Sequence, residues 1–269
     1  MTKIVDGNRI AEEVEKQLET GIKPLLGIIL VGDRKTSEVF VEKKVEACER
    51  NGYRSRVKTF PEDVEQEALK EAIEDWNRDT EVNGILVQLP LPKHIEENQL
   101  FKNLKPAKDV DGLTPENLGK ILRGCEDVVP AAVSAIIEII EQKGIRIETE
   151  DVVIINNSSL IGKPLSMALT NRGATVSLCH KKTENLEKYT QDADMIITAT
   201  GEPGLIEDEM LSENALVIDA SYGFIDGSLV SDTKDLEEDV DLTPVPGGVG
   251  PVTVAKTLEN LVKCYRKQV

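Results

Sequence analysis

The sequence contains few residues of the kind that bind metals, and they are scattered. Its cysteines and histidines are Cys48, Cys125, Cys179, Cys264, His94 and His180. No two cysteines have the close spacing of a zinc site, which gathers several thiolate or imidazole ligands. The sequence therefore argues against a metal centre, and we expect reduced thiols with mostly structural roles.

Long apolar runs are also missing. None approaches the roughly 18 residues that a membrane-spanning helix requires. The N-terminal stretch MTKIVDGNRIAEEVEKQL is amphipathic and acidic, whereas a signal peptide has a basic start followed by an apolar segment. We therefore expect a soluble, cytoplasmic protein.

Positive charge is scarce. The chain has 32 lysines and arginines against 49 aspartates and glutamates, which gives a net charge of −17 at pH 7. Nucleic acids and anionic membranes attract basic surfaces, so neither is expected as a partner. The acidic residues are spread along the chain, which favours a solvated acidic surface.

The sequence does show a regular alternation of strands and helices. Apolar runs at 25–32 and 84–92 and a short strand pattern at 54–60 alternate with helical patterns at 9–18, 37–52 and 63–79. This order favours a parallel sheet, because parallel strands need a crossover connection, usually a helix. A chain of 269 residues also has room for about two domains.

The second half repeats this alternation. We expect a helix at 131–144, a strand, loop and helix over 151–173, and three further apolar runs before residue 221. The sequence therefore predicts an α/β fold with a first domain at 1–120 and a second at 121–250. A final helix at 251–269 could pack on either domain.

One loop has the layout of a phosphate-binding turn. In VVIINNSSLIGKPL a buried strand leads through a tight loop toward a helix N-terminus, where free N–H groups can bind phosphate. Gly162 represents the glycine fingerprint there. Asn156 and Asn157 stand where glycine is usual, and asparagine tolerates left-handed backbone. An ordinary turn between a strand and a helix explains the pattern equally well.

The next apolar run ends in LCHKKT. In a doubly wound sheet this strand end lies near the adenosine ribose, and basic residues there suit the 2′-phosphate of NADP. Lys181 and Lys182 therefore favour NADP over NAD. The alternative is that both are solvated surface lysines.

One lysine has an unusual place in a helical pattern. In SEVFVEKKVEACERNG, Lys44 shares a helix face with Phe40 and Cys48, because residues four apart are neighbours on a helix. Its ammonium either reaches solvent or lies in a pocket where its proton is used.

Three more segments contain residues that a purely structural role would not ordinarily require. Gln88 ends a buried strand, Asp109 and Asp111 lie in a loop, and residues 243–253 are rich in glycine and proline. Separately, each has a structural explanation: a satisfied amide, a turn aspartate or a rigid linker. Their joint presence with Lys44 indicates a site.

At these segments the sequence resembles a known family. LVQLPLPKHI, KDVDGLTPENLGKIL, SSLIGKPL and TPVPGGVGP, in this order and spacing, are similar to the bifunctional methylenetetrahydrofolate dehydrogenase/cyclohydrolase family. The resemblance runs from Ile4 to the final helix. It implies oxidation of 5,10-methylenetetrahydrofolate with NADP and hydrolysis of the methenyl product to 10-formyltetrahydrofolate, in one-carbon metabolism and purine biosynthesis.

The resemblance also implies an architecture. Members have an N-terminal α/β domain with a parallel sheet and a Rossmann-type NADP-binding domain, with the active-site cleft between them. The last helix returns to the first domain, and homodimers are usual.

The resemblance assigns residues by position. Lys44 matches the catalytic lysine, Gln88 the glutamine that positions it, and Asp111 the carboxylate that grips the pterin. The implied folate contacts are Phe40, Val87, Leu89, Pro246, Gly247 and Gly248. The implied NADP contacts are Asn156, Asn157, Ser158, Lys181, Gly201 and Tyr222.

The chain departs from the family pattern at several positions. Phe40 replaces a tyrosine, so we expect a weaker hydrolysis step, and a dehydrogenase that has lost hydrolysis is the second hypothesis. Asn157 replaces an arginine, and Lys181 replaces a serine and could supply the missing charge. Changes at 130–133 and 221–223 also border the implied cleft. A non-catalytic folate- or nucleotide-binding protein is the third hypothesis, and retention of the lysine argues against it.

Overall fold

The chain forms two compact units, each built from two stretches of sequence. The computed structural model describes residues 3–221, 223–225, 228–233, 236 and 240–269. Unit 1 consists of Met1–Glu13 and Ala132–Thr253, and unit 2 of Val14–Ala131 and Val254–Val269. In the described part of the chain, no helix combines the length and apolarity needed to cross a bilayer.

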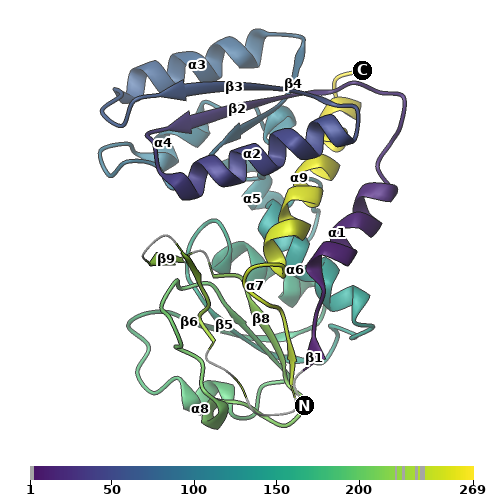
Figure 1. The fold of residues 1–269 in the computed structure, drawn as a ribbon, viewed down its shortest axis with the longest axis vertical. Coiled ribbons are helices and arrows are strands. Elements are labelled where there is room, and N and C mark those ends of the chain that lie inside the picture. Colours follow the sequence, from purple (N-terminus) through teal and green to yellow (C-terminus); the bar gives the residue numbers. More distant parts are fainter. Residues whose placement is uncertain (1–2, 222, 226–227, 234–235, 237–239) are drawn as a thin grey trace. The chain divides into compact units, whose positions relative to one another are not determined.

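Helices and strands alternate through both units (Figure 1). The helices are α1 (Gly7–Lys16), α2 (Lys35–Arg50), α3 (Gln66–Arg78), α4 (Glu97–Lys102), α5 (Pro115–Leu122), α6 (Ala131–Gln142), α7 (Gly162–Asn171), α8 (Glu187–Thr190) and α9 (Val249–Arg266), with short 3-10 turns η1 (Pro106–Lys108) and η2 (Asp208–Met210). The strands are β1 (Lys3–Ile4), β2 (Leu25–Val31), β3 (Arg54–Phe60), β4 (Val82–Val87), β5 (Asp151–Ile155), β6 (Thr175–Cys179), β7 (Met195–Thr198), β8 (Leu216–Asp219), β9 (Gly223–Ile225), β10 (Ser228–Val230) and β11 (Asp241–Leu242).

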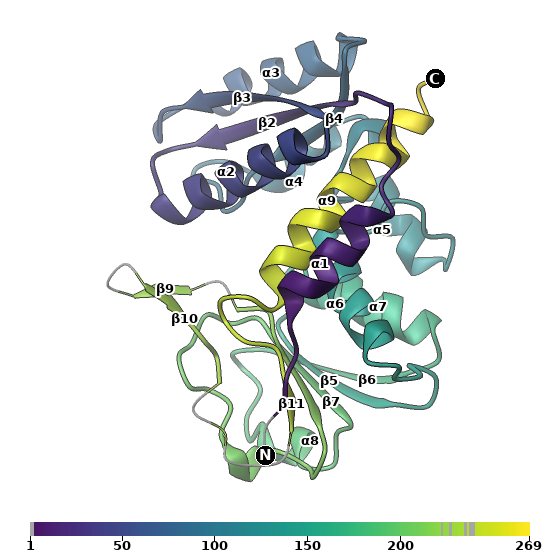
Figure 2. The same cartoon turned by 45° about the vertical axis from the view of Figure 1, so that its right-hand side comes forward.

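Unit 2 contains a parallel sheet of order β3-β2-β4, and helices α2 and α3 cover its opposite faces (Figures 1 and 2). The central strand β2 is buried along its whole length, as expected for a parallel strand covered on both sides. Gly27 makes room for α3, because a Cβ atom there would lie 2.7 Å from the Trp76 ring. The sheet thus packs between the two helices, with α3 close to its central strand.

The C-terminal helix α9 contributes to the core of unit 2. Its Leu258 and Leu261 are fully buried, in one hydrophobic cluster with Leu26 and Ile28 of β2 and Cys48 of α2. Burying side chains of this size stabilises a fold by roughly 1.5–3 kcal/mol each. The last helix is therefore an integral part of this unit.

Unit 1 contains a six-stranded sheet of order β1-β11-β8-β7-β5-β6. Every neighbouring pair in it is parallel. Helix α7 connects β5 to β6, as the sequence predicted. The predicted α/β class with parallel sheets is confirmed by this arrangement.

The structure also contains elements that the sequence pattern did not indicate. Strand β1 pairs with β11, with Lys3 opposite Asp241, so the first residues join the sheet of unit 1. Between the loop of Asp109 and Asp111 and the helix expected at 131–144, the chain forms α5, whose first turn is capped where the N–H of Asn117 donates to the Thr114 hydroxyl. A capping threonine followed by proline is a helix-start signal.

Candidate functional site

Lys44 lies on the buried face of helix α2. Its side chain is 5% exposed, and its Nζ atom donates a 2.9 Å hydrogen bond to Oε1 of Gln88. Among the residues that the structure describes, Gln88 is the hydrogen-bond partner of this ammonium. Of the two alternatives for Lys44, the first does not hold: the side chain is buried and does not extend into solvent.

Gln88 is held in a fixed orientation directly after strand β4. Its backbone N–H donates to the carbonyl of Ile29 on the neighbouring strand (2.9 Å). Its side-chain Nε2 donates to the carbonyl of Leu89 (2.8 Å), which turns the amide oxygen toward Lys44. Because a buried amide with both ends bonded has little freedom, Gln88 fixes the position of the lysine nitrogen.

Burial dominates the electrostatics of the site. It lowers the pKa of Lys44 below the ordinary value of 10.5, and the negative charge of Asp111 partly opposes this. Burial likewise raises the pKa of Asp111, while the charge of Lys44 opposes the rise and that of Asp109 adds to it. Lys44 and Asp111 are thus electrostatically coupled, and a lysine whose pKa is lowered gives up its proton more readily than an exposed one.

Hydrogen bonds of Lys108 and Asp109 anchor the loop that carries Asp111. Lys108 is 6% exposed, and its ammonium donates to the carbonyls of Trp76 (2.8 Å) and Asp79 (2.6 Å) at the end of α3. Asp109 accepts hydrogen bonds from the N–H of Thr114 and the amide of Asn117. Asp109, a candidate from the sequence, therefore acts as a structural residue at the start of α5.

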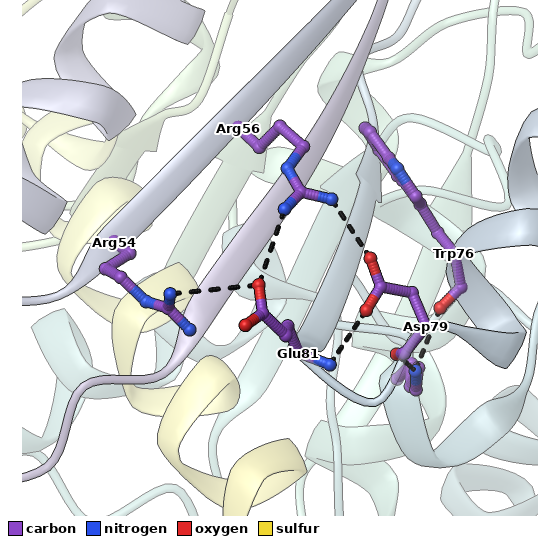
Figure 3. Close-up of polar contacts among 6 residues, drawn as sticks. Arg54, Arg56, Trp76, Asp79 and Glu81 are labelled. Carbon is purple, nitrogen blue, oxygen red and sulfur yellow. Dashed lines mark hydrogen bonds and ion pairs between the residues drawn. The ribbon is translucent and has the colours of Figure 1, made fainter.

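The end of α3 is braced further by ion pairs at the surface (Figure 3). Arg56 lies 3.0 Å from the carboxylate of Asp79 and 3.7 Å from that of Glu81. Arg54 also approaches Glu81, at 4.0 Å. Exposed pairs of this kind contribute little individually, about 0–1 kcal/mol, but they surround the backbone carbonyl of Asp79 that receives Lys108.

The apolar residues expected to contact folate lie beside Lys44 and Gln88 in the chain. Phe40 is partly buried one helical turn before Lys44, and the ammonium of Lys43 lies 5.6 Å from its ring centroid. Val87 is buried and Leu89 is partly buried, on either side of Gln88. Cys48, on the same helix face, is buried, and its pKa is raised to about 12, so the thiol is structural.

In unit 1, the side chain of Asn156 organises the predicted phosphate loop. Its Oδ1 accepts hydrogen bonds from the N–H (2.9 Å) and hydroxyl (2.7 Å) of Ser158 and from the N–H of Gly162 (3.1 Å). Its Nδ2 donates to the carbonyl of Ala199, after β7 (2.6 Å). Asn156 therefore ties the end of β5 to the start of α7 and to the neighbouring loop.

Asn156 and Asn157 do not use the left-handed backbone that asparagine tolerates. Neither residue has a positive φ, because Asn156 acts through its side chain and the loop follows ordinary backbone angles. Gly162 is needed for close approach: a Cβ atom there would lie 1.6 Å from the carbonyl oxygen of Asn156. Glycine is thus required at the first position of α7 by packing against the strand end.

The other cofactor candidates lie at the carboxyl ends of neighbouring strands. Lys181 is exposed just after β6, in a turn where the N–H of His180 donates to the Thr183 hydroxyl. Asn157 is exposed after β5, and Gly201 follows β7 with a φ of +72°. Strands β5, β6 and β7 are parallel neighbours, so these residues share one edge of the sheet. Tyr222 lies outside the described residues.

The glycine-rich segment before α9 packs tightly on the N-terminal segment. Gly247 has a φ of +104°, and its carbonyl accepts a 2.9 Å hydrogen bond from the N–H of Gly7. A Cβ atom on Gly7 would lie 1.9 Å from the carbonyl oxygen of Gly248. Pro246 is exposed beside them. The two segments thus approach each other too closely for a side chain at Gly7.

The structure identifies residues at the Lys44 site that sequence reasoning missed. Ser37 lies on the same face of α2 as Lys44, 2% exposed, and its hydroxyl has no hydrogen-bond partner within the described part of the chain. Lys108 and Asn260 are buried and bond to backbone carbonyls around the Asp111 loop. A serine two turns before a helical lysine was the available signal for Ser37.

Comparison with known proteins agrees with these features. The family model described as the catalytic domain of tetrahydrofolate dehydrogenase/cyclohydrolase matches residues 5–111, and the model of its NAD(P)-binding domain matches residues 130–269. The chain is 40% identical over 279 residues to the bifunctional protein FolD of Methanococcoides burtonii, covering 99% of this chain and 97% of that protein.

Solved structures are similar over the whole chain. The bifunctional FolD enzyme of Campylobacter jejuni has a TM-score of 0.92 and 37% identity, covering 100% of both chains. The Trypanosoma brucei methylenetetrahydrofolate dehydrogenase-cyclohydrolase, determined with NADP and an inhibitor, has a TM-score of 0.92 and 31% identity, covering 99% of this chain and 98% of that one. The chain belongs to the tetrahydrofolate dehydrogenase/cyclohydrolase family.

Proposed function

We propose that the protein is a bifunctional enzyme of one-carbon metabolism. It oxidises 5,10-methylenetetrahydrofolate to the 5,10-methenyl form with NADP, and it hydrolyses the methenyl form to 10-formyltetrahydrofolate. The observation that carries the proposal is the buried hydrogen bond between Lys44 and Gln88, close enough to Asp111 for their charges to interact. A family member that served only as a binding module would gain nothing from a desolvated amine.

In the hydrolysis step, Lys44 is proposed to move a proton. As the neutral amine, it accepts a proton from the water that attacks the methenyl carbon. The resulting ammonium returns that proton to N5 as the carbon–N5 bond breaks, and the new hydroxyl group loses its proton to solvent as the formyl C=O forms. Lys44 can fill both roles because burial lowers its pKa.

Gln88 and Asp111 are proposed to align this chemistry. The amide oxygen of Gln88 holds the lysine nitrogen at 2.9 Å, which leaves the other N–H donors of the ammonium for water and substrate. The carboxylate of Asp111 grips the amino and ring N–H groups of the pterin, a paired contact that fixes orientation. Phe40, Val87 and Leu89 supply apolar contacts to the folate, and Pro246, Gly247 and Gly248 are proposed to contact it as well.

The residues of unit 1 fit a dinucleotide. The parallel sheet carries its loops at one edge, the close approach at Gly162 allows a tight turn into α7, and Lys181 offers an exposed positive charge beside β5. NADP bound there would supply the hydride acceptor. For this step no side-chain base is needed, because the carbon that releases the hydride is already activated by two nitrogens.

The proposed cofactor site includes a positive charge for the 2′-phosphate, the group that distinguishes NADP from NAD. We propose that Lys181 binds the 2′-phosphate, with Asn156, Asn157, Ser158, Gly201 and Tyr222 as further cofactor contacts. Asn156 and Ser158 hold the N–H groups of Ile161 and Gly162 within the loop, so they contribute mainly by fixing its shape. An exposed lysine therefore takes over the role of the missing arginine.

Phe40 is proposed to weaken the hydrolysis step without abolishing it. Phenylalanine packs on the folate as tyrosine would, but it has no hydroxyl to orient Lys44 or substrate. The proposal also includes a cytoplasmic location and a homodimer. The catalytic domain is assigned to 1–120 with 251–269, and the NADP-binding domain to 121–250, whose residues 246–248 also contact folate.

One experiment tests both steps together. The purified protein is mixed with 5,10-methylenetetrahydrofolate and either NADP or NAD, and the appearance and decay of the methenyl form are followed by absorbance. We expect appearance with NADP, followed by enzyme-dependent decay. A preparation that is folded but does not form the methenyl compound with either cofactor contradicts the proposed function.

A further inference from the structure

Asn260 on α9 joins two loops of unit 2. Its side chain is 1% exposed. Both hydrogens of its amide are used: Nδ2 donates to the carbonyl of Val110 (2.8 Å) and to the carbonyl of Val129 (2.8 Å). A single buried amide therefore connects the C-terminal helix, the Asp111 loop and the segment before α6.

The two loops also meet at Gly112, directly after Asp111. Gly112 has a φ of +64°, and a Cβ atom there would lie 3.0 Å from both the carbonyl oxygen of Val128 and the nitrogen of Pro130. Asp111 thus stands between two fixed points, the Val110 carbonyl held by Asn260 and the packed turn at Gly112.

The remaining anchors of the loop act before Val110. Lys108 is bound to the end of α3, and Asp109 to Thr114 and Asn117. Of the polar side chains described around the loop, Asn260 is the one that binds the carbonyl next to Asp111. It is therefore the contact best placed to set the direction of the Asp111 side chain.

We propose that Asn260 is a positioning residue of the active site: by holding the Val110 and Val129 carbonyls together, it fixes the Asp111 carboxylate relative to the Lys44 ammonium. The inference rests on the proposed function, because it assigns the C-terminal helix a part in folate binding and hydrolysis. The charges of Lys44 and Asp109 act on Asp111, and the charge of Asp111 acts on Lys44, so a displaced Asp111 changes the electrostatic field at Lys44.

The test compares Asn260→Leu, which has a similar size and no donors, with the parent enzyme. Asn77→Leu is the matched control, because Asn77 is also buried and makes two backbone hydrogen bonds, to the Asn103 carbonyl and from the Lys105 N–H. Methenyl hydrolysis is measured from pH 6 to 10 with the concentration of the methenyl form varied. Dehydrogenation is measured with 5,10-methylenetetrahydrofolate and NADP varied in turn, and thermal melting confirms folding.

We expect Asn260→Leu to raise the folate KM about tenfold or more and to leave the NADP KM within about twofold. Because the Asp111 charge supports the ammonium of Lys44, its displacement moves the pH midpoint of hydrolysis to lower pH. Asn77→Leu lowers the melting temperature without either change. Asn260→Ser, which retains one donor, gives an intermediate KM and covers the case in which the leucine variant does not fold.

An unchanged folate KM and pH midpoint in the folded Asn260 variants overturns the inference, as do equal changes in Asn77→Leu. These outcomes are distinct from failure of the proposed function, in which the parent protein itself does not turn over either folate. If the parent protein is inactive in this way, both the proposed function and the role of Asn260 are wrong.

Discussion

The Nζ atom of Lys44 lies 2.9 Å from Oε1 of Gln88, although the residues belong to a helix and to the end of a strand. The amide of Gln88 is oriented by its bond to the Leu89 carbonyl. The lysine is buried, so its ammonium depends on this one oxygen and on the charge of Asp111 for stabilisation. Gln88 therefore fixes the position of the lysine nitrogen, and the charge of Asp111 influences when it gives up its proton.

Replacing Lys44 by methionine is expected to separate the two reactions. Hydrolysis falls by about 10²–10⁴-fold, since the proton carrier is lost, whereas dehydrogenation stays within about tenfold because hydride transfer needs no side-chain base. Separate assays of methenyl formation and methenyl decay measure this. Lys43→Met, an exposed neighbour on the same helix, serves as control. Hydrolysis at the parent rate in Lys44→Met excludes the assigned role.

Gln88→Glu is expected to shift the pH dependence of hydrolysis. A carboxylate at 2.9 Å from the ammonium favours the charged lysine and raises its pKa. The neutral amine then forms only at higher pH, so the rising limb of the pH–rate profile moves upward and the rate at pH 7 falls. Gln99→Glu adds the same charge at an exposed position and should leave the profile in place. A rising limb that stays at the parent pH argues against coupling between residues 44 and 88.

Lys44 should also make stability depend on pH. Its pKa in the folded protein is lowered from the ordinary value of 10.5, which it regains in the unfolded chain. At a pH between the folded-state pKa and the unfolded-state pKa, the unfolded chain therefore binds more protons than the folded one. Stability of the parent therefore rises with pH across this window, by up to about 1.4 kcal/mol per pH unit. Below the lowered pKa the contribution is constant. Urea unfolding of the parent and of Lys44→Met at several alkaline pH values measures the difference, and parallel curves contradict the lowered pKa.

Phe40→Tyr is expected to increase hydrolysis about 2- to 10-fold, the effect of one additional hydrogen bond of about 0.5–1.5 kcal/mol. Dehydrogenation should change less. Phe60→Tyr is a matched control, since Phe60 also has a lysine ammonium over its ring, that of Lys58 at 5.2 Å. If the tyrosine at residue 40 leaves the methenyl decay rate as it was, the missing hydroxyl does not limit hydrolysis.

Lys181→Ala is expected to raise the KM for NADP about 5- to 20-fold and leave the KM for NAD unchanged, since only NADP carries the 2′-phosphate. Lys182→Ala removes the same charge from the adjacent exposed residue and should have a smaller effect. Steady-state dehydrogenation with each cofactor gives these values. If Lys181→Ala prefers NADP over NAD as strongly as the parent does, another group binds the 2′-phosphate.

The regular elements could be predicted from sequence because they bury continuous apolar faces. The run LLGIILV became a strand buried on both sides, and the strands and helices between residues 9 and 92 followed their periodicity. Strand β1 was not predictable, because a two-residue strand has no period and depends on pairing with β11. The helix α5 was missed although Thr114 and Pro115 carry a recognised start signal.

The candidate site was less accessible to sequence reasoning. Periodicity placed Lys44 on a buried helix face, but the family resemblance alone connected it with Gln88, which follows 44 residues later. The side-chain role of Asn156 could not be recognised, because asparagine occurs in loops both for its tolerant backbone and for its side-chain hydrogen bonds. Asn260 was not noticed, since a polar residue within an amphipathic helix looks solvent-facing until its contacts to Val110 and Val129 are known.

The pairing of Lys3 and Ile4 with Asp241 and Leu242 has a consequence for biosynthesis. On the ribosome, the first strand emerges long before the strand that it needs as a neighbour. Strand β1 must therefore remain without its neighbour until residues 241 and 242 have been synthesised. Completion of this sheet edge thus follows synthesis of the strands between them, and a chain that stops before residue 241 would leave Lys3 and Ile4 without a partner strand.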